Sequence, residues 1–584
     1  MTRALALGAL LLLAACADMR LPFLESADEA RATPEAATRE TGPTEIAAAW
    51  ASRHMVAAAN PHAAEAGREI LRAGGSAVDA AIAAQLVLTL VEPQSSGIGG
   101  GAFLLHYEAE SRDVTAYDGR ETAPAAATSE LFLTAEGAPM GFWKAVVGGR
   151  SVGVPGLLKM LKLAHEEHGR LPWPVLFEPA IRLAETGFEV SPRLHKLLAK
   201  DRFLASQAAA RAYFYDADGQ PHPVGHRLVN EDLANTLRLV AWGGLKGFYE
   251  GDIARDIVAA VQSGGNPGAM TLEDLRDYPA KHRDALCAPY REWRVCGMPP
   301  PTSGGLAVLQ ILGLLEPFDL ASLDPNGAEA AHLIAEASRL AFADRNRFPA
   351  DPDFVAVPVE ALLDRDYLRR RAALISPDES LGTAEPGLES QSAAMPDQND
   401  PPSTSHLVVV DKRGNAVSMT SSIESAFGSR QMVRGFLLNN ELTDFSFRPE
   451  VGGRPIANRV EGGKRPRSSM SPMLVLDGEG RLVLAIGSPG GSRIIGYVAR
   501  GLIAALDWQL DMASVVSLPH VVNRNGPTDI EFGTALQSAT AGLRARGHKL
   551  RFLEMTSGTH AIAVTPNGLD GAADPRREGV ALGD

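Results

Sequence analysis

Near residue 404 the sequence changes from a segment that favours no regular structure to one that favours a β-sheet. Residues 381–402 are rich in Ser, Glu, Gln, Pro and Asp and show no periodicity, which is typical of an exposed or disordered linker. Residues 406–410 and 416–421 are then predicted to form two strands joined by a short turn. The strand pair therefore begins directly after the linker, and Ser403 and Thr404 lie where the two meet.

A hydroxyl residue at such a junction can cut its own chain. Its oxygen attacks the carbonyl carbon of the preceding residue, the acyl group shifts from nitrogen to oxygen, and water releases the ester. Cleavage between Ser403 and Thr404 would leave Thr404 with a free α-amine, whose pKa of about 8 suits it as general base for the Thr404 hydroxyl. Taken alone this signal is weak, because Ser and Thr at the start of a strand usually have no such role.

A glycine-rich segment offers a site for an oxyanion. Gly490 and Gly491 come just before an apolar helix predicted at residues 494–506. Backbone N–H groups at the start of a helix point outward and stabilise a negative charge, including that of a tetrahedral intermediate. The alternative is a tight turn that does no more than cap the helix.

Three other segments carry polar groups that suit an amino acid. Ser468 and Ser469 lie ahead of a predicted strand, while Glu441 and Asp444 are close enough in sequence to receive an ammonium from one side. Arg120 can bind a carboxylate through two parallel hydrogen bonds. Each segment also has an interpretation without a function. The serines could lie in a polar loop, the two acids in a solvated turn, and Arg120 in a surface salt bridge. With the nucleophile and the oxyanion site, however, they fit one substrate class, an α-amino acid presented through a side-chain acyl group.

Two other motifs do not indicate a cofactor or a metal. The glycines at residues 97–101 follow a buried helix predicted at 77–91 and precede a predicted strand at 102–107, whereas a dinucleotide-binding loop follows a strand and opens a helix. The His-Glu-Glu-His run at residues 165–168 spaces its histidines three apart rather than the four of a zinc-protease helix. We expect this run to lie on a solvated helix face.

The N-terminus indicates export. Residues 4–15 form an apolar run that is too short to span a bilayer, and a Leu-Ala-Ala-Cys sequence ends it at Cys16. The pattern predicts a signal peptide at residues 1–15 and a periplasmic protein held to the bacterial membrane by lipid on Cys16. An ordinary secretory signal is the alternative. Residues 16–44, rich in Ala, Glu, Pro and Thr, are predicted to be a flexible tether.

The net charge and the cysteine content argue against two kinds of partner, nucleic acid and a structural zinc ion. The chain carries 56 basic and 70 acidic residues, a net charge of −14, without a long Lys/Arg block, which argues against nucleic acid. Cys287 and Cys296 flank a predicted hairpin tip, where either a disulfide or two free thiols would fit. With Cys16 they make three cysteines, too few for a structural zinc site built from cysteines alone.

In these segments the sequence resembles the γ-glutamyltransferases (glutathione hydrolases) of the N-terminal-nucleophile hydrolase superfamily. The resemblance runs from about residue 55 to 576 and includes Gly-Gly-Ser-Ala-Val-Asp-Ala-Ala at 74–81 and Pro-Pro-Pro-Thr-Ser-Gly-Gly at 299–305. It implies an α+β fold, a four-layer αββα sandwich in which a large subunit (45–403) and a small catalytic subunit (404–584) form one intertwined unit. It also implies a small-molecule γ-glutamyl substrate and no metal or organic cofactor.

The resemblance further assigns roles. Thr404 would be the nucleophile and Ser403–Thr404 the cleavage site, with Gly490 and Gly491 as the oxyanion hole. The remaining roles concern the donor: Arg120, Ser468 and Ser469 would hold its α-carboxylate, and Glu441 and Asp444 its α-amine.

Two departures from the family pattern bear on the substrate. The family usually has Thr-x-Asn shortly after the nucleophile, and here the matching positions are Ser422 and Glu424. Ser422 keeps a hydroxyl for Thr404, but Glu424 is expected to add a charge that either binds the donor ammonium or repels its α-carboxylate. The segment at 445–467, which covers the pocket in some members, is short here and predicts an open site.

The sequence therefore predicts a self-cleaving hydrolase or transferase that breaks γ-glutamyl amides such as glutathione and passes the acyl group to water or an amine. Two alternatives stay open. One is a related acylase of the same fold, a glutaryl or cephalosporin-type amidase, which Glu424 favours. The other is a non-catalytic surface lipoprotein, against which Thr404, the two glycines and Arg120 argue.

Overall fold

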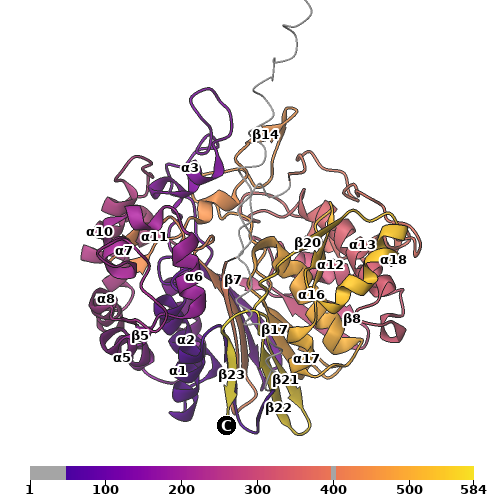
Figure 1. Ribbon diagram of the computed structural model, residues 1–584, viewed down its shortest axis with the longest axis horizontal. Coiled ribbons are helices and arrows are strands. Elements are labelled where there is room, and N and C mark those ends of the chain that lie inside the picture. Colours follow the sequence, from indigo (N-terminus) through magenta and orange to yellow (C-terminus); the bar gives the residue numbers. More distant parts are fainter. Residues whose placement is uncertain (1–47, 396–402) are drawn as a thin grey trace, which may run out of the picture. The chain divides into compact units, whose positions relative to one another are not determined.

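The computed structural model describes residues 48–395 and 403–584. The predicted signal peptide (1–15) and the whole predicted tether (16–44), including Cys16, lie outside the described residues. Two antiparallel seven-stranded sheets face each other, and helices cover the outer face of each (Figure 1). The predicted four-layer αββα sandwich of the α+β class is confirmed.

The strands of both sheets come from distant parts of the chain. The first sheet consists, in spatial order, of β1 (Ala49–Ala51), β22 (Gly568–Ala573), β21 (His560–Thr565), β17 (Leu482–Gly487), β16 (Met473–Leu476), β9 (Trp293–Gly297) and β8 (Leu286–Tyr290). The second consists of β23 (Val580–Gly583), β2 (Met55–Ala58), β10 (Ser405–Val410), β11 (Ala416–Ser422), β3 (Gly101–Glu108), β4 (Asp113–Asp118) and β7 (Lys281–Asp284).

Each sheet has its own helical layer. Over the second sheet lie α1 (Pro61–Arg72), α2 (Ala77–Val91), α4 (Leu157–His168), α5 (Glu178–Thr186) and α8 (Glu231–Gly243). Over the first sheet lie α12 (Gly304–Leu315), α13 (Ala328–Arg345), α16 (Ile494–Leu506) and α17 (Met512–Ser517). The other helices of at least six residues are α6 (Pro192–Lys200), α7 (Ala208–Phe214), α10 (Gly251–Val261), α11 (Leu272–Asp277), α15 (Arg365–Ala372) and α18 (Thr540–Ala545). A smaller sheet holds β18 (Val521–Asn523), β19 (Thr528–Glu531) and β20 (Leu550–Leu553).

The helix α2 shows why these elements form where the sequence places them. Ser76 caps it, accepting a hydrogen bond from Asp79 N–H (3.1 Å) while the Asp79 carboxylate accepts one from Ser76 N–H (2.9 Å). Every residue of α2 is buried, because the helix lies between the sheet and other helices and its nearly all-apolar sequence has no solvated face.

The chain before Thr404 and the chain after it share both sheets. In the second sheet β10 and β11 lie between β2 and β3, and in the first sheet β22, β21, β17 and β16 lie between β1 and β9. A cut at this boundary would therefore leave the two chains joined by backbone hydrogen bonds along several strand pairs.

One expectation made from sequence is met in part, and a second needs correction. The described part of the predicted linker, residues 381–395, contains no helix or strand, yet it is fixed to the fold: Gly387 N–H donates to Asp344 (2.8 Å) and Met395 N–H to the carbonyl of Asn346 (2.8 Å). In the run 165–168, Glu166 and Glu167 are exposed as predicted, but both histidines are partly buried, because α4 packs that side against the sheet.

The hairpin question is also answered. Cys287 on β8 lies opposite Cys296 on β9, and the two form a disulfide. The predicted tip, Arg291 and Glu292, joins the two strands.

As for membrane spans, the helices within 48–395 and 403–584 all lack the combined length and apolar character that crossing a bilayer requires.

Candidate active site

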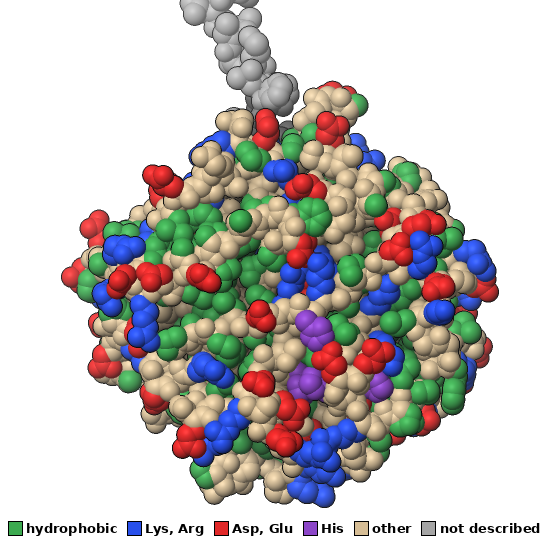
Figure 2. Space-filling model, turned by 180° about the vertical axis from the view of Figure 1, so that it is seen from behind, with side chains coloured by type: hydrophobic (Ala, Val, Ile, Leu, Met, Phe, Trp, Pro, Cys, Tyr) green, Lys and Arg blue, Asp and Glu red, His purple; other side chains and the backbone are tan. Residues whose placement is uncertain are grey.

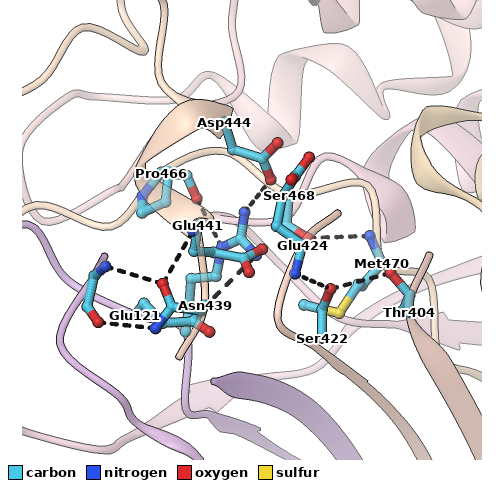
Figure 3. Close-up of polar contacts among 12 residues, drawn as sticks. Glu121, Thr404, Ser422, Glu424, Asn439, Glu441, Asp444, Pro466, Ser468 and Met470 are labelled. Atoms are coloured by element: carbon cyan, nitrogen blue, oxygen red, sulfur yellow. Dashed lines mark hydrogen bonds and ion pairs between the residues drawn. The ribbon is translucent and has the colours of Figure 1, made fainter. Parts of the chain in front are cut away.

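Thr404 lies at the start of β10, next to the end of β11. Ser405 on β10 pairs with Ser421 on β11 in the antiparallel sheet. Thr404, directly before Ser405, therefore faces Ser422, directly after Ser421. Thr404 Oγ1 therefore lies 3.1 Å from Ser422 Oγ (Figure 3). Ser422 Oγ also accepts a hydrogen bond from Glu424 N–H (2.8 Å), which fixes its position beside Thr404.

The backbone of Thr404 is strained. Its φ of +83° is an outlier for a β-branched residue, and such a conformation costs about 1–3 kcal/mol. The carbonyl oxygen of Thr404 accepts a hydrogen bond from Arg577 Nη1 (2.9 Å), which helps to hold this conformation.

Gly490 contacts the carbonyl before Thr404. Its N–H donates to the carbonyl oxygen of Ser403 at 3.1 Å, and its φ is +131°. A Cβ at this position would lie 2.7 Å from Cε2 of Tyr497, so both backbone conformation and space require glycine. Gly491 follows with φ +64° and opens the short turn that leads into α16.

Arg120, in the loop after β4, is almost fully buried and joins two segments. Its guanidinium makes ion pairs with Glu441 and Asp444 and donates to the backbone carbonyls of Pro466 (3.2 Å) and Arg467 (3.1 Å). Figure 3 shows the partners Glu441, Asp444 and Pro466 close together in the site. The groups predicted to bind a donor carboxylate and a donor amine are thus paired with each other in the structure.

Burial raises the pKa of three acids near Arg120. Burial raises the pKa of Glu441 to about 7, although the charge of Arg120 opposes the change. Burial, with the carboxylates of Asp444 and Glu441, raises the pKa of Glu424 well above its usual range. Glu121 accepts no hydrogen bond from any described residue through either carboxylate oxygen, and burial raises its pKa as well. Burial and the neighbouring acids therefore shift Glu424 toward its neutral form.

The Ser468–Ser469 segment is held from two sides. The backbone carbonyl of Ser468 accepts from Ser303 N–H (2.8 Å), and Ser468 Oγ accepts from Met470 N–H (3.1 Å). Ser469 Oγ accepts from Arg345 Nη2 (2.7 Å). Arg345, at the end of α13, thus brings a second guanidinium to the site.

The structure brings most of the predicted residues into one cavity. Among the residues that line it are Arg120, Thr404, Ser422, Glu424, Glu441, Asp444, Ser468, Ser469 and Gly491. Gly490 is not among them, and its N–H donates to the carbonyl oxygen of Ser403. Sequence reasoning did not predict four residues that line the same cavity, Arg345, Arg467, Met470 and Ile494, nor did it predict Arg577. Arg467 and Met470 flank the predicted serines in sequence, whereas Arg345 and Arg577 lie in distant segments that no local motif marks.

The αββα sandwich defines a fold of the N-terminal-nucleophile hydrolase type, and Thr404 lies buried directly before one of its inner strands. Residues 63–584 match the family described as gamma-glutamyltranspeptidase. The chain therefore belongs to the gamma-glutamyltranspeptidase family.

Relatives with two kinds of name are similar to this chain. The glutathione hydrolase proenzyme of Bacillus subtilis (strain 168) is 36% identical over 544 residues, which cover 91% of each chain. The acylase ACY 1 proenzyme of Pseudomonas sp. (strain SE83) is 36% identical over 538 residues, 90% of this chain and 93% of the relative. The crystal structure of cephalosporin acylase from Bacillus halodurans superposes with a TM-score of 0.80 at 27% identity. The match covers 94% of this chain and 98% of the acylase chain.

Proposed function

We propose that this protein cuts its own chain before Thr404 and then breaks γ-glutamyl amides such as glutathione, passing the acyl group from Thr404 to water or an amine. The observation that carries the proposal is the contact between Gly490 N–H and the Ser403 carbonyl oxygen, beside Thr404 Oγ1. The peptide bond to be cut thus already has a hydrogen-bond donor where negative charge would develop. Family membership supports the same activity.

Self-cleavage follows from this geometry. Thr404 Oγ1 attacks the carbonyl carbon of Ser403, the hydroxyl proton passes to the Thr404 nitrogen, and the C–N bond breaks to leave an ester. Water hydrolyses the ester, giving a Ser403 carboxylate and a Thr404 with free amine and hydroxyl. Cleavage also removes the strained φ of Thr404, because an N-terminal residue has no preceding peptide.

Turnover would reuse the same groups. The α-amine of Thr404 takes the proton of its own hydroxyl, and Oγ1 attacks the γ-carbonyl of the donor. The oxyanion then takes the place of the Ser403 carbonyl oxygen, against the N–H groups of Gly490 and Gly491. One such donor typically lowers the barrier by about 3 kcal/mol. Ser422 orients the attacking oxygen.

The donor would be bound by the groups around Arg120. Its α-carboxylate would lie against Arg120, Ser468 and Ser469, and its α-ammonium against Glu441 and Asp444. Because Arg120 already pairs with both acids, a zwitterionic donor extends an existing pattern of alternating charge instead of meeting an isolated ion. No organic cofactor is needed for any of these steps.

Glu424 is the feature that favours the acylase alternative, and donor selectivity tests it. We expect kcat/KM for γ-glutamyl-p-nitroanilide to exceed that for glutaryl-p-nitroanilide at least tenfold, because only the first carries an ammonium and a charge-assisted hydrogen bond contributes about 1.5–3 kcal/mol. Glu424→Gln, a neutral side chain of the same shape, should change this ratio little, since Glu424 itself favours the neutral form.

A ratio near one, or a reversed ratio, would support the acylase instead. A large gain in γ-glutamyl turnover in Glu424→Gln would show that Glu424 is charged and repels the donor carboxylate.

Intact masses of the protein expressed with its own signal test both the cut and the anchor. We expect two chains: a small one that begins at Thr404 and a large one that begins at Cys16, carries the added mass of lipid and is found in the membrane fraction. The control, Cys16→Ser, should lose the lipid but still be cut before Thr404. A large chain that begins elsewhere and lacks lipid would overturn the anchor alone, and a single uncut chain would overturn the nucleophile.

A further inference from the structure

A second group of chemically active side chains lies away from Thr404, on the sheet face beneath α4. His106 and Glu108 are two residues apart on β3, so they project from the same face of the sheet. The helix α4 covers that face and contributes His168. One nitrogen from each histidine and one carboxylate oxygen of Glu108 all lie within 4.8 Å of one another.

His106 is poorly satisfied by the surrounding protein. It is 1% exposed, and its Nδ1 is buried without a hydrogen-bond partner among the residues described. Its ring stacks on that of His168, with the centroids 3.7 Å apart. An unsatisfied buried polar atom in a native structure calls for a partner.

Neighbouring hydrogen bonds orient His168. The Tyr117 hydroxyl donates to Glu167 Oε2 (2.8 Å) and lies 2.7 Å from His168 Nε2. Because the Tyr117 hydrogen goes to Glu167, His168 Nε2–H donates to the Tyr117 oxygen, which leaves the lone pair on Nδ1. His168 Nδ1 lies 3.9 Å from Glu108 Oε2. A carboxylate or hydroxyl that fixes the far nitrogen of a histidine is the usual support of a metal ligand.

The same face offers further acidic and imidazole groups. His282 on β7 lies opposite Tyr117 in the sheet, and its Nε2 is 2.7 Å from Glu167 Oε1. Glu108 and His168 are partly exposed, so an ion could reach them from solvent. On the face of the molecule shown in Figure 2, the histidines that reach the surface lie beside acidic side chains.

We propose that His106, Glu108 and His168 bind a divalent transition-metal ion of the Zn²⁺ type. Two neutral imidazoles and one carboxylate are a ligand set that zinc accepts, with a fourth position left to water. At zinc–ligand distances of about 2.0–2.2 Å, tetrahedral ligand atoms lie roughly 3.4 Å apart, so the ligand atoms must close inward by about 1 Å. The His168 ring must also tilt out of its stack on His106, with which it makes an angle of 24°, so that both lone pairs point at one ion. Glu108 and His168 are the partly exposed members of the cluster, and we expect them to make most of this movement.

In a second histidine–glutamate cluster, by contrast, the histidine nitrogens all bond to other protein groups. His332, Glu336 and His548 are also close enough to hold an ion, but the two rings bond each other (2.7 Å), His332 Nε2 bonds the Ser376 carbonyl (2.7 Å) and His548 Nδ1 bonds Thr528 Oγ1 (2.9 Å). All four ring nitrogens have protein partners. We therefore assign this cluster to packing and not to metal binding.

Cobalt titration of the purified, cleaved protein after treatment with a chelator tests the proposal. We expect one equivalent of Co²⁺ to bind with the visible absorption bands of a four- or five-coordinate site, and Zn²⁺ to displace it. His168→Ala and Glu108→Gln should each weaken Co²⁺ binding at least tenfold. Both lie at the rim, so they avoid the loss of folding that a change at buried His106 risks.

The matched control is Glu166→Gln, an exposed residue of the same helix with an ion pair only to Lys162, which should bind Co²⁺ as the parent does. Hydrolysis of a γ-glutamyl anilide should be the same in all three variants, so the result does not depend on the proposed activity. Absence of saturable one-to-one binding, or equal binding in His168→Ala and Glu108→Gln, would overturn the site.

Discussion

Replacing Thr404 with Ala is expected to leave one uncut chain that has no measurable γ-glutamyl hydrolysis. Alanine lacks the hydroxyl that attacks the Ser403 carbonyl, and removal of a catalytic nucleophile typically lowers kcat by about 10⁶-fold. Alanine still carries a Cβ at the positive φ of residue 404, so most of the backbone strain stays. The loss would therefore be due to the missing hydroxyl and not to relief of strain. Intact mass and an anilide assay measure both effects.

Two variants make this result interpretable. Thr404→Ser keeps a hydroxyl and should still give two chains. Ser403→Ala removes the neighbouring hydroxyl, which donates to the Gln94 carbonyl at 2.8 Å, and should also be cut, because the reaction uses only the carbonyl of residue 403. A small chain that still begins at residue 404 in the folded Thr404→Ala variant would refute the assignment of the nucleophile.

Replacing Gly490 with Ala is expected to slow both self-cleavage and turnover by about 10²–10³-fold, the usual effect of losing one oxyanion donor. Side chains rarely adopt the φ of +131° found at Gly490, and the new Cβ would meet Tyr497 at 2.7 Å. The backbone must therefore rotate, which moves the N–H away from the Ser403 carbonyl oxygen. Self-cleavage is measured as the rate at which the small chain appears. Turnover is measured as kcat/KM of the fraction of the protein that has been cleaved.

Gly478→Ala is the matched control for this change. It lies in the turn between β16 and β17, its φ is not in the left-handed region, and no described atom lies within 4 Å of an added Cβ. A double variant, Gly490→Ala with Tyr497→Leu, removes the ring but not the backbone restriction and should stay slow. Recovery of the rate in the double variant would mean that the clash, and not the N–H, caused the loss.

Local sequence determined the elements and the position of the candidate cleavage site. The capping Ser76 and the unbroken apolar run after it predict α2 as a helix buried on all sides, and the structure has it at those residues. The strands β10 and β11 begin within a residue of their predicted positions. These features depend on period and capping, which are properties of neighbours in the chain. The four-layer αββα sandwich was predicted from the resemblance to a family and not from local sequence patterns.

Only the tertiary structure decided how the site residues meet. Arg120 pairs with Glu441 and Asp444, Gly490 bonds the Ser403 carbonyl, and the order of strands in the sheets brings these distant segments together. Residue type alone could not show that Glu424 favours its neutral form, because its pKa depends on burial and on neighbouring acids.

The same reason explains what sequence reasoning missed on the far side of the sheet. Spacing within the run 165–168 excluded a protease-like zinc site, but it could not reveal that His168 packs on His106 and faces Glu108 of another element. Sequence patterns fix which face a residue takes within its own helix or strand. Contacts between faces depend on strand register and helix packing across hundreds of residues, and these are settled only when the whole chain folds.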